Sequence, residues 1–136
     1  MKKFGLLILF VLLFLTACGG NTSDTDSTSF TPAPIPAEYA GKTNPLDASA
    51  AIDGATVFKA NCATCHGETG AGDGIASGSL DPKPANLAVV SEQVGDDYLF
   101  WRIHDGKPGT SMVAWKGILS EEQMWQTVAF IRTLKK

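Results

Sequence analysis

Three blocks of the chain carry apolar residues at the spacing of an α-helix, and they predict the elements of a folded domain. The first block runs from about residue 47 to 61 and begins with two capping candidates, Asp47 and Ser49. The second covers residues 96–105, and the third begins at residue 120. The period-two alternation that indicates a strand is missing from the sequence. We therefore expect an all-α fold with about three main helices.

The last two helices have recognisable ends. Asp96 is expected to cap the second helix, and Gly106 is expected to end it as a C-terminal glycine. Ser120 and Gln123 have the spacing of a capping box at the start of the third helix. Glu121 follows at the positive end of that helix dipole. These signals predict where the two helices begin and where the second one ends.

Long loops separate the expected helices. Residues 67–95 are rich in glycine and proline, and residues 107–117 form a second stretch without helical pattern. We place the folded domain at residues 47–136, which is about 90 residues with a small core. Domains of that size usually depend on a disulfide, a metal or a large cofactor.

The amino terminus has the features of an export signal. Two lysines precede an apolar run, Phe4–Leu15, whose 12 residues are too few for a membrane span of about 20. The run ends in Leu-Thr-Ala-Cys, which resembles the bacterial lipobox and implies cleavage before Cys18 with diacylation of its sulfur. We therefore predict a lipoprotein signal peptide at residues 1–17. The alternative is an ordinary signal peptide with a cysteine near its end.

Residues 18–46 are predicted to be a lipid-anchored flexible linker. They are rich in Ser, Thr, Asp and Pro and lack apolar periodicity. Residues 37–46 look less like a linker than the residues before them. The alternative is that they form a strap that lies on the domain or on a partner. Losing the two signal-peptide lysines would take the net charge from −3 to −5. A mildly acidic mature chain gives no support for nucleic-acid binding.

One cysteine pair carries the candidate chemistry. Cys62 and Cys65 are followed at once by His66, which suits a redox disulfide, a zinc site or covalent haem. A redox dithiol is expected to begin a helix in a βαβ unit, and this pair follows a helix. Zinc would need His104 as its fourth ligand, and the adjacent Cys65 and His66 would strain one tetrahedron. Cys-x-x-Cys-His in an exported chain favours attachment of one haem c.

Residues from about 50 to 136 resemble a class I bacterial cytochrome c. Beyond the haem motif, Gly54 and Phe58 match a glycine and an aromatic residue of that family on its first helix. Phe130 matches the aromatic partner on the last helix. The resemblance implies that the two helices cross at Gly54, which would explain a mid-helix glycine that costs about 1 kcal/mol relative to alanine.

The resemblance also implies the remaining haem contacts. The segment Asp-Pro-Lys-Pro-Ala-Asn-Leu resembles the family segment whose proline carbonyl, here that of Pro84, accepts a hydrogen bond from His66, while Leu87 lines the haem. Met112 occupies the position of the second axial ligand. Many relatives have proline after this methionine, and here Val113 follows it.

Four other residues are candidates for the haem pocket or the core. Met124 lies on the last helix and is expected to pack in the core. His104 is a candidate distal ligand, although a histidine on the surface at a helix end is the plainer interpretation. Trp101 and Trp115 are expected in the haem pocket or the core.

The resemblance implies an electron carrier, not an enzyme, that cycles Fe(III)/Fe(II). The export signal and the lipobox predict that it lies on the outer side of the cytoplasmic membrane. Its expected partners are redox proteins such as a membrane quinol-oxidising complex, a terminal oxidase or a reaction centre. A subunit beside alternative complex III or a terminal oxidase is one form of this hypothesis. The alternatives are a haem sensor or enzyme with a labile sixth ligand, and a structural subunit that also passes electrons.

Overall fold

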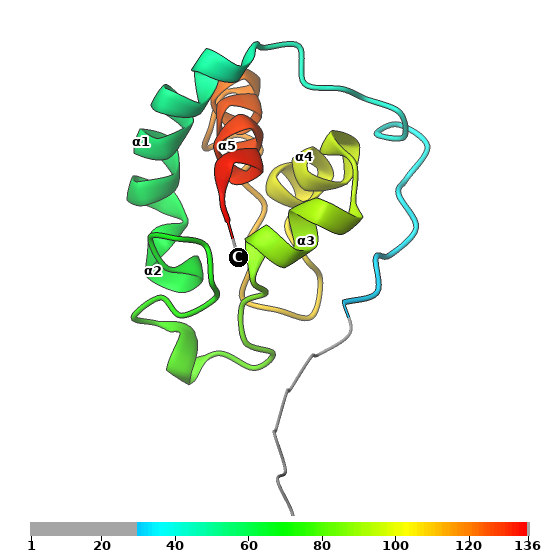
Figure 1. The fold of residues 1–136 in the computed structure, drawn as a ribbon. Helices are drawn as coiled ribbons and strands as arrows, with labels where there is room; N and C mark the ends of the chain where they lie inside the picture. Colours follow the sequence, from blue (N-terminus) through cyan, green and yellow to red (C-terminus); the bar gives the residue numbers. More distant parts are fainter. Residues whose placement is uncertain (1–29, 136) are drawn as a thin grey trace, which may run out of the picture.

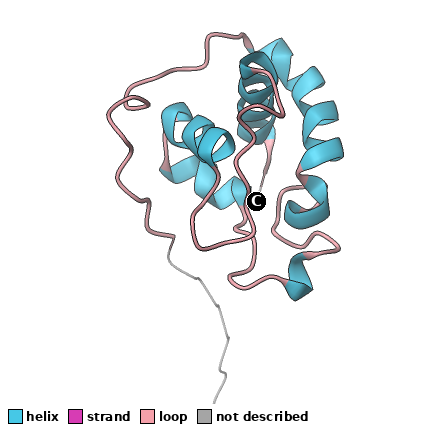
Figure 2. Cartoon of the chain, turned by 180° about the vertical axis from the view of Figure 1, so that it is seen from behind, coloured by secondary structure: helices cyan, strands magenta, loops and turns pink. Residues whose placement is uncertain are grey.

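The computed structural model describes residues 30–135 of the chain, and the regular structure in that range is helical (Figures 1 and 2). The α-helices are α1 (Ala51–Asn61), α2 (Ala63–His66), α3 (Leu87–Gln93), α4 (Asp96–Asp105) and α5 (Glu121–Thr133). Two short 3-10 turns lie at Ala48–Ala50 and Ser77–Ser79. The all-α prediction is confirmed, and α1, α4 and α5 are the three helices expected from the sequence.

Helices α1 and α5 cross in close contact (Figure 1). Gly54 is buried at the crossing, where an added Cβ would overlap the backbone carbonyl of Gln126 and lie 3.0 Å from Cβ of Phe130. The rings of Phe58 and Phe130 pack with their centroids 5.0 Å apart. The close helix approach inferred for Gly54 is therefore present.

Helix α3 lies inside the region expected to be a loop, so that prediction was wrong for residues 87–93. The side chain of Asn86 accepts hydrogen bonds from the N–H groups of Ala88 and Val89 and caps this helix. The helix is short and lies between glycines and prolines, so the sequence pattern does not reveal it. Val90 is buried and packs in the core, which holds α3 against the rest of the domain.

The predicted helix ends are largely as expected. Gly95, not Asp96, is the cap residue of α4, and Asp96 is the first residue of the helix. Gly106 ends α4 with φ of +72°, a left-handed value that favours glycine. Ser120 and Gln123 form both hydrogen bonds of the capping box at the start of α5.

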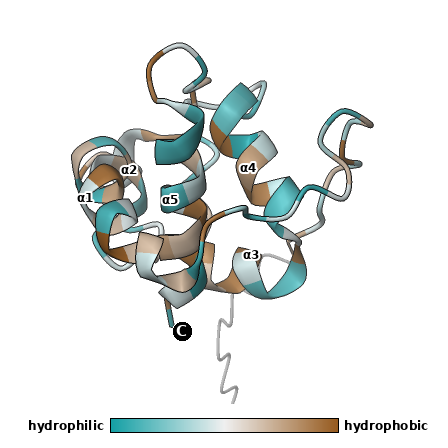
Figure 3. Cartoon of the chain, turned by 90° about the horizontal axis from the view of Figure 1, so that it is seen from above, coloured by the Kyte–Doolittle hydropathy of each residue, from teal (hydrophilic) through white to brown (hydrophobic). Residues whose placement is uncertain are grey.

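The core lies between α1, α4 and α5. Figure 3 shows hydrophobic and hydrophilic positions on different faces of these helices. The ring of Phe100 from α4 stacks on Trp125 from α5, with the centroids 4.1 Å apart. The other large buried residues are Phe58, Val90, Tyr98, Leu99, Ile103, Met124, Val128 and Ile131.

Residues 30–46 pack along the domain and form what we call the strap (Figure 1). Tyr39 is only 7% exposed, and its hydroxyl donates a 2.8 Å hydrogen bond to Asp105 on α4. The side-chain amide of Asn44 donates to the backbone carbonyl of Trp125 over 2.8 Å. Of the two interpretations of residues 37–46, these contacts fit a strap on the domain.

The expected signal peptide, the lipidation site at Cys18 and the first part of the linker lie outside the described residues. Across residues 30–135, each helix is too short or too polar to cross a membrane.

Candidate cofactor site

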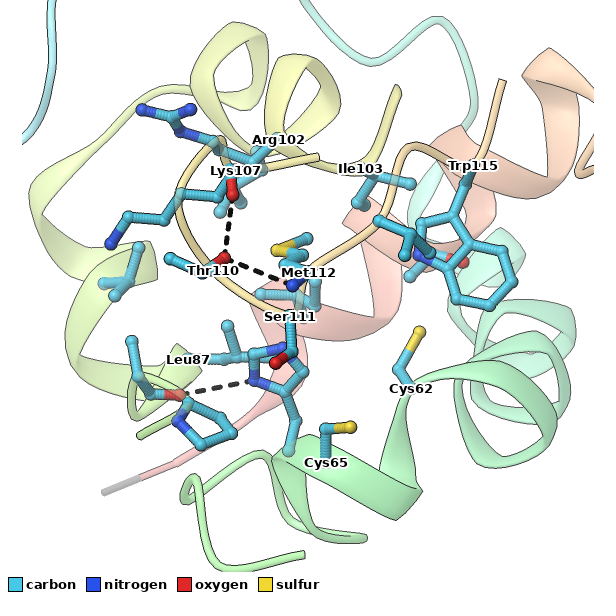
Figure 4. A pocket seen from close by; sticks show the side chains of 18 of the residues that line it. Cys62, Cys65, Leu87, Arg102, Ile103, Lys107, Thr110, Ser111, Met112 and Trp115 are labelled. Atoms are coloured by element: carbon cyan, nitrogen blue, oxygen red, sulfur yellow. Dashed lines mark hydrogen bonds between the residues drawn. The ribbon is translucent and has the colours of Figure 1, made fainter. Parts of the chain in front are cut away.

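A cavity of about 260 Å³ lies between the Cys-x-x-Cys-His segment, helices α3 and α4, and the loop that precedes α5 (Figure 4). Its lining is mainly apolar. The apolar residues include Phe30, Phe58, Leu80, Pro82, Pro84, Leu87, Val90, Leu99, Ile103, Val113, Trp115 and Ile131. Such a lining suits a flat, apolar cofactor and favours its transfer out of water.

The turn of α2 gathers the three motif side chains. Cys62 ends α1 with its N–H bonded to the carbonyl of Phe58, over 2.8 Å. The N–H groups of Cys65 and His66 then donate to the carbonyl of Cys62, at 3.1 and 2.9 Å. All three side chains line the cavity. The close helical turn therefore places both sulfurs and the imidazole at one end of α1.

The two cysteines are free thiols in the structure. Burial, with a smaller contribution from the charge of Cys65, raises the pKa of Cys62 to about 12. The thiol of Cys62 is thus protonated at neutral pH. Neither cysteine is engaged in a disulfide that would compete with attachment of a cofactor.

The imidazole of His66 has a backbone partner, but it is not the one expected. Its Nδ1 lies 3.4 Å from the carbonyl oxygen of Ala85. The carbonyl of Pro84 faces Gly72, where an added Cβ would approach the carbonyl carbon of Pro84 to 3.2 Å. Successive carbonyls of an extended segment point in opposite directions. The acceptor for His66 is therefore the carbonyl of Ala85, one residue after the predicted Pro84.

Burial lowers the pKa of His66, and the hydrogen bond to Ala85 opposes that shift. A histidine in this environment stays neutral at physiological pH. Neutral imidazole is the form that binds a metal ion, and an Nδ1–H bond to a carbonyl leaves Nε2 available as the ligand.

The glycine-rich loop after the motif folds back against it. Gly72 donates its N–H to the carbonyl of His66 over 2.8 Å, and Gly74 donates to that of Cys65 over 3.2 Å. Gly74 is buried so closely that an added Cβ would lie 2.6 Å from the carbonyl oxygen of Ala63. The loop thereby braces the turn that carries the motif.

Met112 reaches the cavity from the loop between α4 and α5. Its carbonyl accepts a 3.0 Å hydrogen bond from the N–H of Lys107, and its own N–H donates to the hydroxyl of Thr110 over 3.1 Å. Figure 4 shows Met112 on the wall opposite Cys65. These hydrogen bonds hold the loop in place. The residue after the methionine is Val113, not proline, and it is 58% exposed.

The structure brings together the expected candidates Cys62, Cys65, His66, Leu87 and Met112. Pro84 also lines the cavity, although its carbonyl is not the partner of His66.

The other four candidate residues lie in different parts of the domain. Met124 is 3% exposed in the core, as predicted. His104 lies beside the strap, with Nδ1 2.9 Å from the hydroxyl of Tyr39 and 2.8 Å from Asp105. Trp115 lines the cavity. Trp101 packs against the ring of Tyr39, with the centroids 6.4 Å apart.

Sequence reasoning missed the lining contributed by Phe30, Arg102 and Thr127. Phe30 belongs to a segment whose composition indicated a linker. Arg102 lies four residues after Tyr98, which also lines the cavity, so the helical period of α4 was the available signal.

The family comparison agrees with this arrangement. Residues 49–131 match the family described as cytochrome c oxidase, cbb3-type, subunit III. This chain belongs to that cytochrome c family. The cytochrome is also 30% identical to cytochrome c6 of Euglena gracilis over 80 residues, which cover 59% of this chain and 87% of that protein.

Two solved structures share the fold of this cytochrome. One is a chain of a reducing HAO-like protein complex of Kuenenia stuttgartiensis, with a TM-score of 0.56, 19% identity and coverage of 78% of this chain. The other is cytochrome CL of Methylophaga aminisulfidivorans, with a TM-score of 0.51, 22% identity and coverage of 65%. The match spans 48% and 55% of those two chains, so about half of each has a counterpart here.

Membership of the cytochrome c family implies one covalently bound haem c, as expected from the sequence. The donor set of the cavity fits that group. Two free thiols could form the thioether bonds, a neutral imidazole and a thioether sulfur could serve as iron ligands, and the apolar walls suit the macrocycle. Haem-based electron transfer is the corresponding activity.

Proposed function

We propose that this cytochrome is an electron carrier whose haem iron is held by His66 and Met112, with Cys62 and Cys65 as the attachment points. The observation that carries the proposal is that His66 and Met112 line one apolar cavity from separate segments of the chain. When bound, the haem supplies a one-electron Fe(III)/Fe(II) couple. Filling both axial positions would leave no place for an exogenous ligand.

The protein's own contribution is to hold and shield that couple. The carbonyl of Ala85 would orient the ring of His66 and increase its basicity as a ligand. The hydrogen-bonded loop at Thr110 would hold Met112 in place. Burial of the macrocycle and ligation by a thioether both favour a comparatively high reduction potential.

We also propose that the domain is tethered outside the cytoplasmic membrane through lipid on Cys18. Two acyl chains would give a stable anchor, whereas one gives marginal binding. The segment between Cys18 and Phe30 spans at most about 40 Å when fully extended. The domain would therefore work close to the membrane surface and to membrane-bound redox proteins.

The partners we propose are a membrane quinol-oxidising complex, a terminal oxidase or a reaction centre. The family description names an oxidase subunit, and one fold neighbour belongs to a multiprotein complex; both support a role beside or within a redox complex. A subunit associated with alternative complex III or a terminal oxidase is the specific form we propose. Co-purification of a large complex from detergent-extracted membranes would separate a subunit from a free shuttle.

A haem sensor or enzyme with a labile sixth ligand is the second candidate. The exposed Val113 beside Met112, in place of a rigid proline, favours it. Carbon monoxide binding to the reduced holoprotein discriminates between the two candidates. An electron carrier leaves the spectrum unchanged on mixing, while rapid formation of a carbon monoxide adduct would establish an open iron and refute the carrier.

A further inference from the structure

The loop that carries Met112 is closed at its base against the last turn of α4. The N–H of Trp115 donates to the carbonyl of Ile103, and the N–H of Lys116 donates to the carbonyl of His104, both over 3.1 Å. The position of Met112 therefore depends on how firmly the base of this loop is held against the end of α4.

Asp105 joins three segments of the chain at that base. Its carboxylate accepts a 3.0 Å hydrogen bond from the ammonium group of Lys116, which belongs to the loop. The other carboxylate oxygen accepts the 2.8 Å hydrogen bond from the hydroxyl of Tyr39, which belongs to the strap. Nδ1 of His104 lies 2.8 Å from the oxygen that Lys116 contacts. We call these four residues the Asp105 junction.

The strap side of the junction is firmly placed. The ring of Tyr39 packs on Phe100 and Trp101 of α4, with centroid distances of 6.3 and 6.4 Å. Burial, followed by the hydrogen bond to Asp105, raises the pKa of Tyr39 to about 12. The hydroxyl is thus protonated at neutral pH and remains a donor to the carboxylate. A hydrogen bond to an ionised acceptor is stronger than one between neutral groups.

We propose that the strap helps to keep Met112 on the haem iron by holding the base of the loop through Tyr39 and Asp105. This inference rests on the proposed ligation by Met112 and adds the strap to the segments that maintain it. The hydrogen bonds of Lys107 and Thr110 hold the loop around Met112, and the Asp105 junction adds a side-chain contact at its base. Tyr39 does not line the cavity, so it is a positioning residue.

The rate at which the oxidised holoprotein binds cyanide tests the proposal. Cyanide reaches Fe(III) only after Met112 has left it, so the rate at saturating cyanide measures how often the loop opens. Tyr39→Phe removes the hydroxyl that donates to Asp105 and keeps the ring. Losing a hydrogen bond to a charged group changes such an equilibrium by about tenfold. Tyr39→Phe should therefore bind cyanide about ten times faster than the wild type.

The matched control is Asn44→Ala, which removes a different hydrogen bond of the strap. The side-chain amide of Asn44 donates over 2.8 Å to the backbone carbonyl of Trp125 on α5, away from the loop. This variant should lose stability as Tyr39→Phe does, but it should bind cyanide at the wild-type rate. On the loop side, Lys116→Gln should speed cyanide binding, and Lys116→Arg should restore the wild-type rate because it keeps the charge.

Heating gives a second measurement that a general loss of stability does not imitate. In Tyr39→Phe, the near-infrared band of methionine-bound ferric haem should fade at a lower temperature than the helical circular dichroism. In Asn44→Ala, the band and the helices should be lost together.

A Tyr39→Phe protein that binds cyanide no faster than Asn44→Ala would overturn the proposal. The near-infrared band of the wild type separates this failure from that of the proposed iron site. If the wild type has the band and the two variants bind cyanide equally fast, only the role of the strap fails. If the wild type lacks the band, ligation by Met112 and the role of the strap fail together.

Discussion

Replacing Gly54 with alanine puts a methyl group into the contact between α1 and α5. The added Cβ would lie 2.6 Å from the backbone carbonyl carbon of Gln126, whereas ordinary contact begins at 3.4 Å. The carbonyl oxygen of Gln126 lies closer still, so the two helix backbones must separate by more than about 0.8 Å. The obstacle is a backbone group of another helix, so no side chain can rotate to make room.

The cost of this change can be worked from two opposing terms. Alanine is a better helix former than glycine by about 1 kcal/mol, which favours the variant. Overpacking a well-packed contact costs about 1–3 kcal/mol and sometimes more, and a backbone obstacle puts this site at or above the upper end. Separation of the helices also weakens the packing of Phe58 on Phe130. We expect a net destabilisation of about 2–3 kcal/mol.

Thermal unfolding of the oxidised holoprotein, followed by circular dichroism, measures the effect. A loss of 1 kcal/mol shifts Tm by about 4–8 °C in a domain of this size, so Tm should fall by roughly 8–24 °C. Gly78→Ala is the control because that glycine is exposed and an added Cβ would meet nothing within 4 Å. Its Tm should change little. A Gly54→Ala protein as stable as the wild type would refute the close crossing.

Four further predictions concern the strap, Asp105, the thiols and the lipid anchor. Tyr39→Phe should lower Tm by a few degrees, since it removes the hydroxyl that bonds to Asp105. Hydrogen bonds from His104, Lys116 and Tyr39 outweigh burial and lower the pKa of Asp105 to about 2, so Asp105→Asn should be less stable than the wild type above pH 4 in urea titrations, and the difference should vanish as the pH falls through 2. Denatured wild-type protein should keep its haem in acid acetone, and Cys62→Ala/Cys65→Ala should release it; free haem from the wild type would exclude thioether attachment. Cys18→Ser should leave an uncleaved precursor or a soluble cytochrome, and wild-type protein washed from membranes by salt alone would contradict the anchor.

The sequence predicted most of the features that have a local cause. The helix of residues 121–133 was found through its capping box and its apolar face, because both depend on neighbours within one or two turns. Gly106 was recognised as a helix end for the same reason. The mid-helix Gly54 indicated a close helix crossing, but the partner helix came from the family resemblance, since a lone glycine does not indicate which element approaches it.

The features that were missed depend on tertiary contacts. Helix α3 has only seven residues between glycines and prolines, and its capping by Asn86 becomes recognisable only when the helix is seen. The strap has the composition of a linker, but the rings of Phe30 and Tyr39 pack against aromatic rings of α4. The acceptor for His66 moved from Pro84 to Ala85 because a shift of one residue reverses the direction of a carbonyl.

The arrangement of the cations in the cavity was also beyond sequence reasoning. Arg102 belongs to a helix whose apolar residues suggested only a core face. Its placement is defined by stacking against Trp101 and by its position across the cavity from Cys62. Neither relation has a signal in the spacing of residues along the chain.

The near-infrared absorption of the oxidised holoprotein tests the proposed iron site most directly. Ligation of Fe(III) by His66 and Met112 predicts the weak charge-transfer band of methionine-bound ferric haem. Met112→Ala should abolish the band and lower the reduction potential, because a thioether stabilises Fe(II) more than water or imidazole does. Met124→Leu, a volume-conserving change in the core, should keep the band and cost less than about 1.5 kcal/mol of stability. A wild-type spectrum without the band, or low-spin character lost in His104→Ala and kept in Met112→Ala, would contradict the assignment.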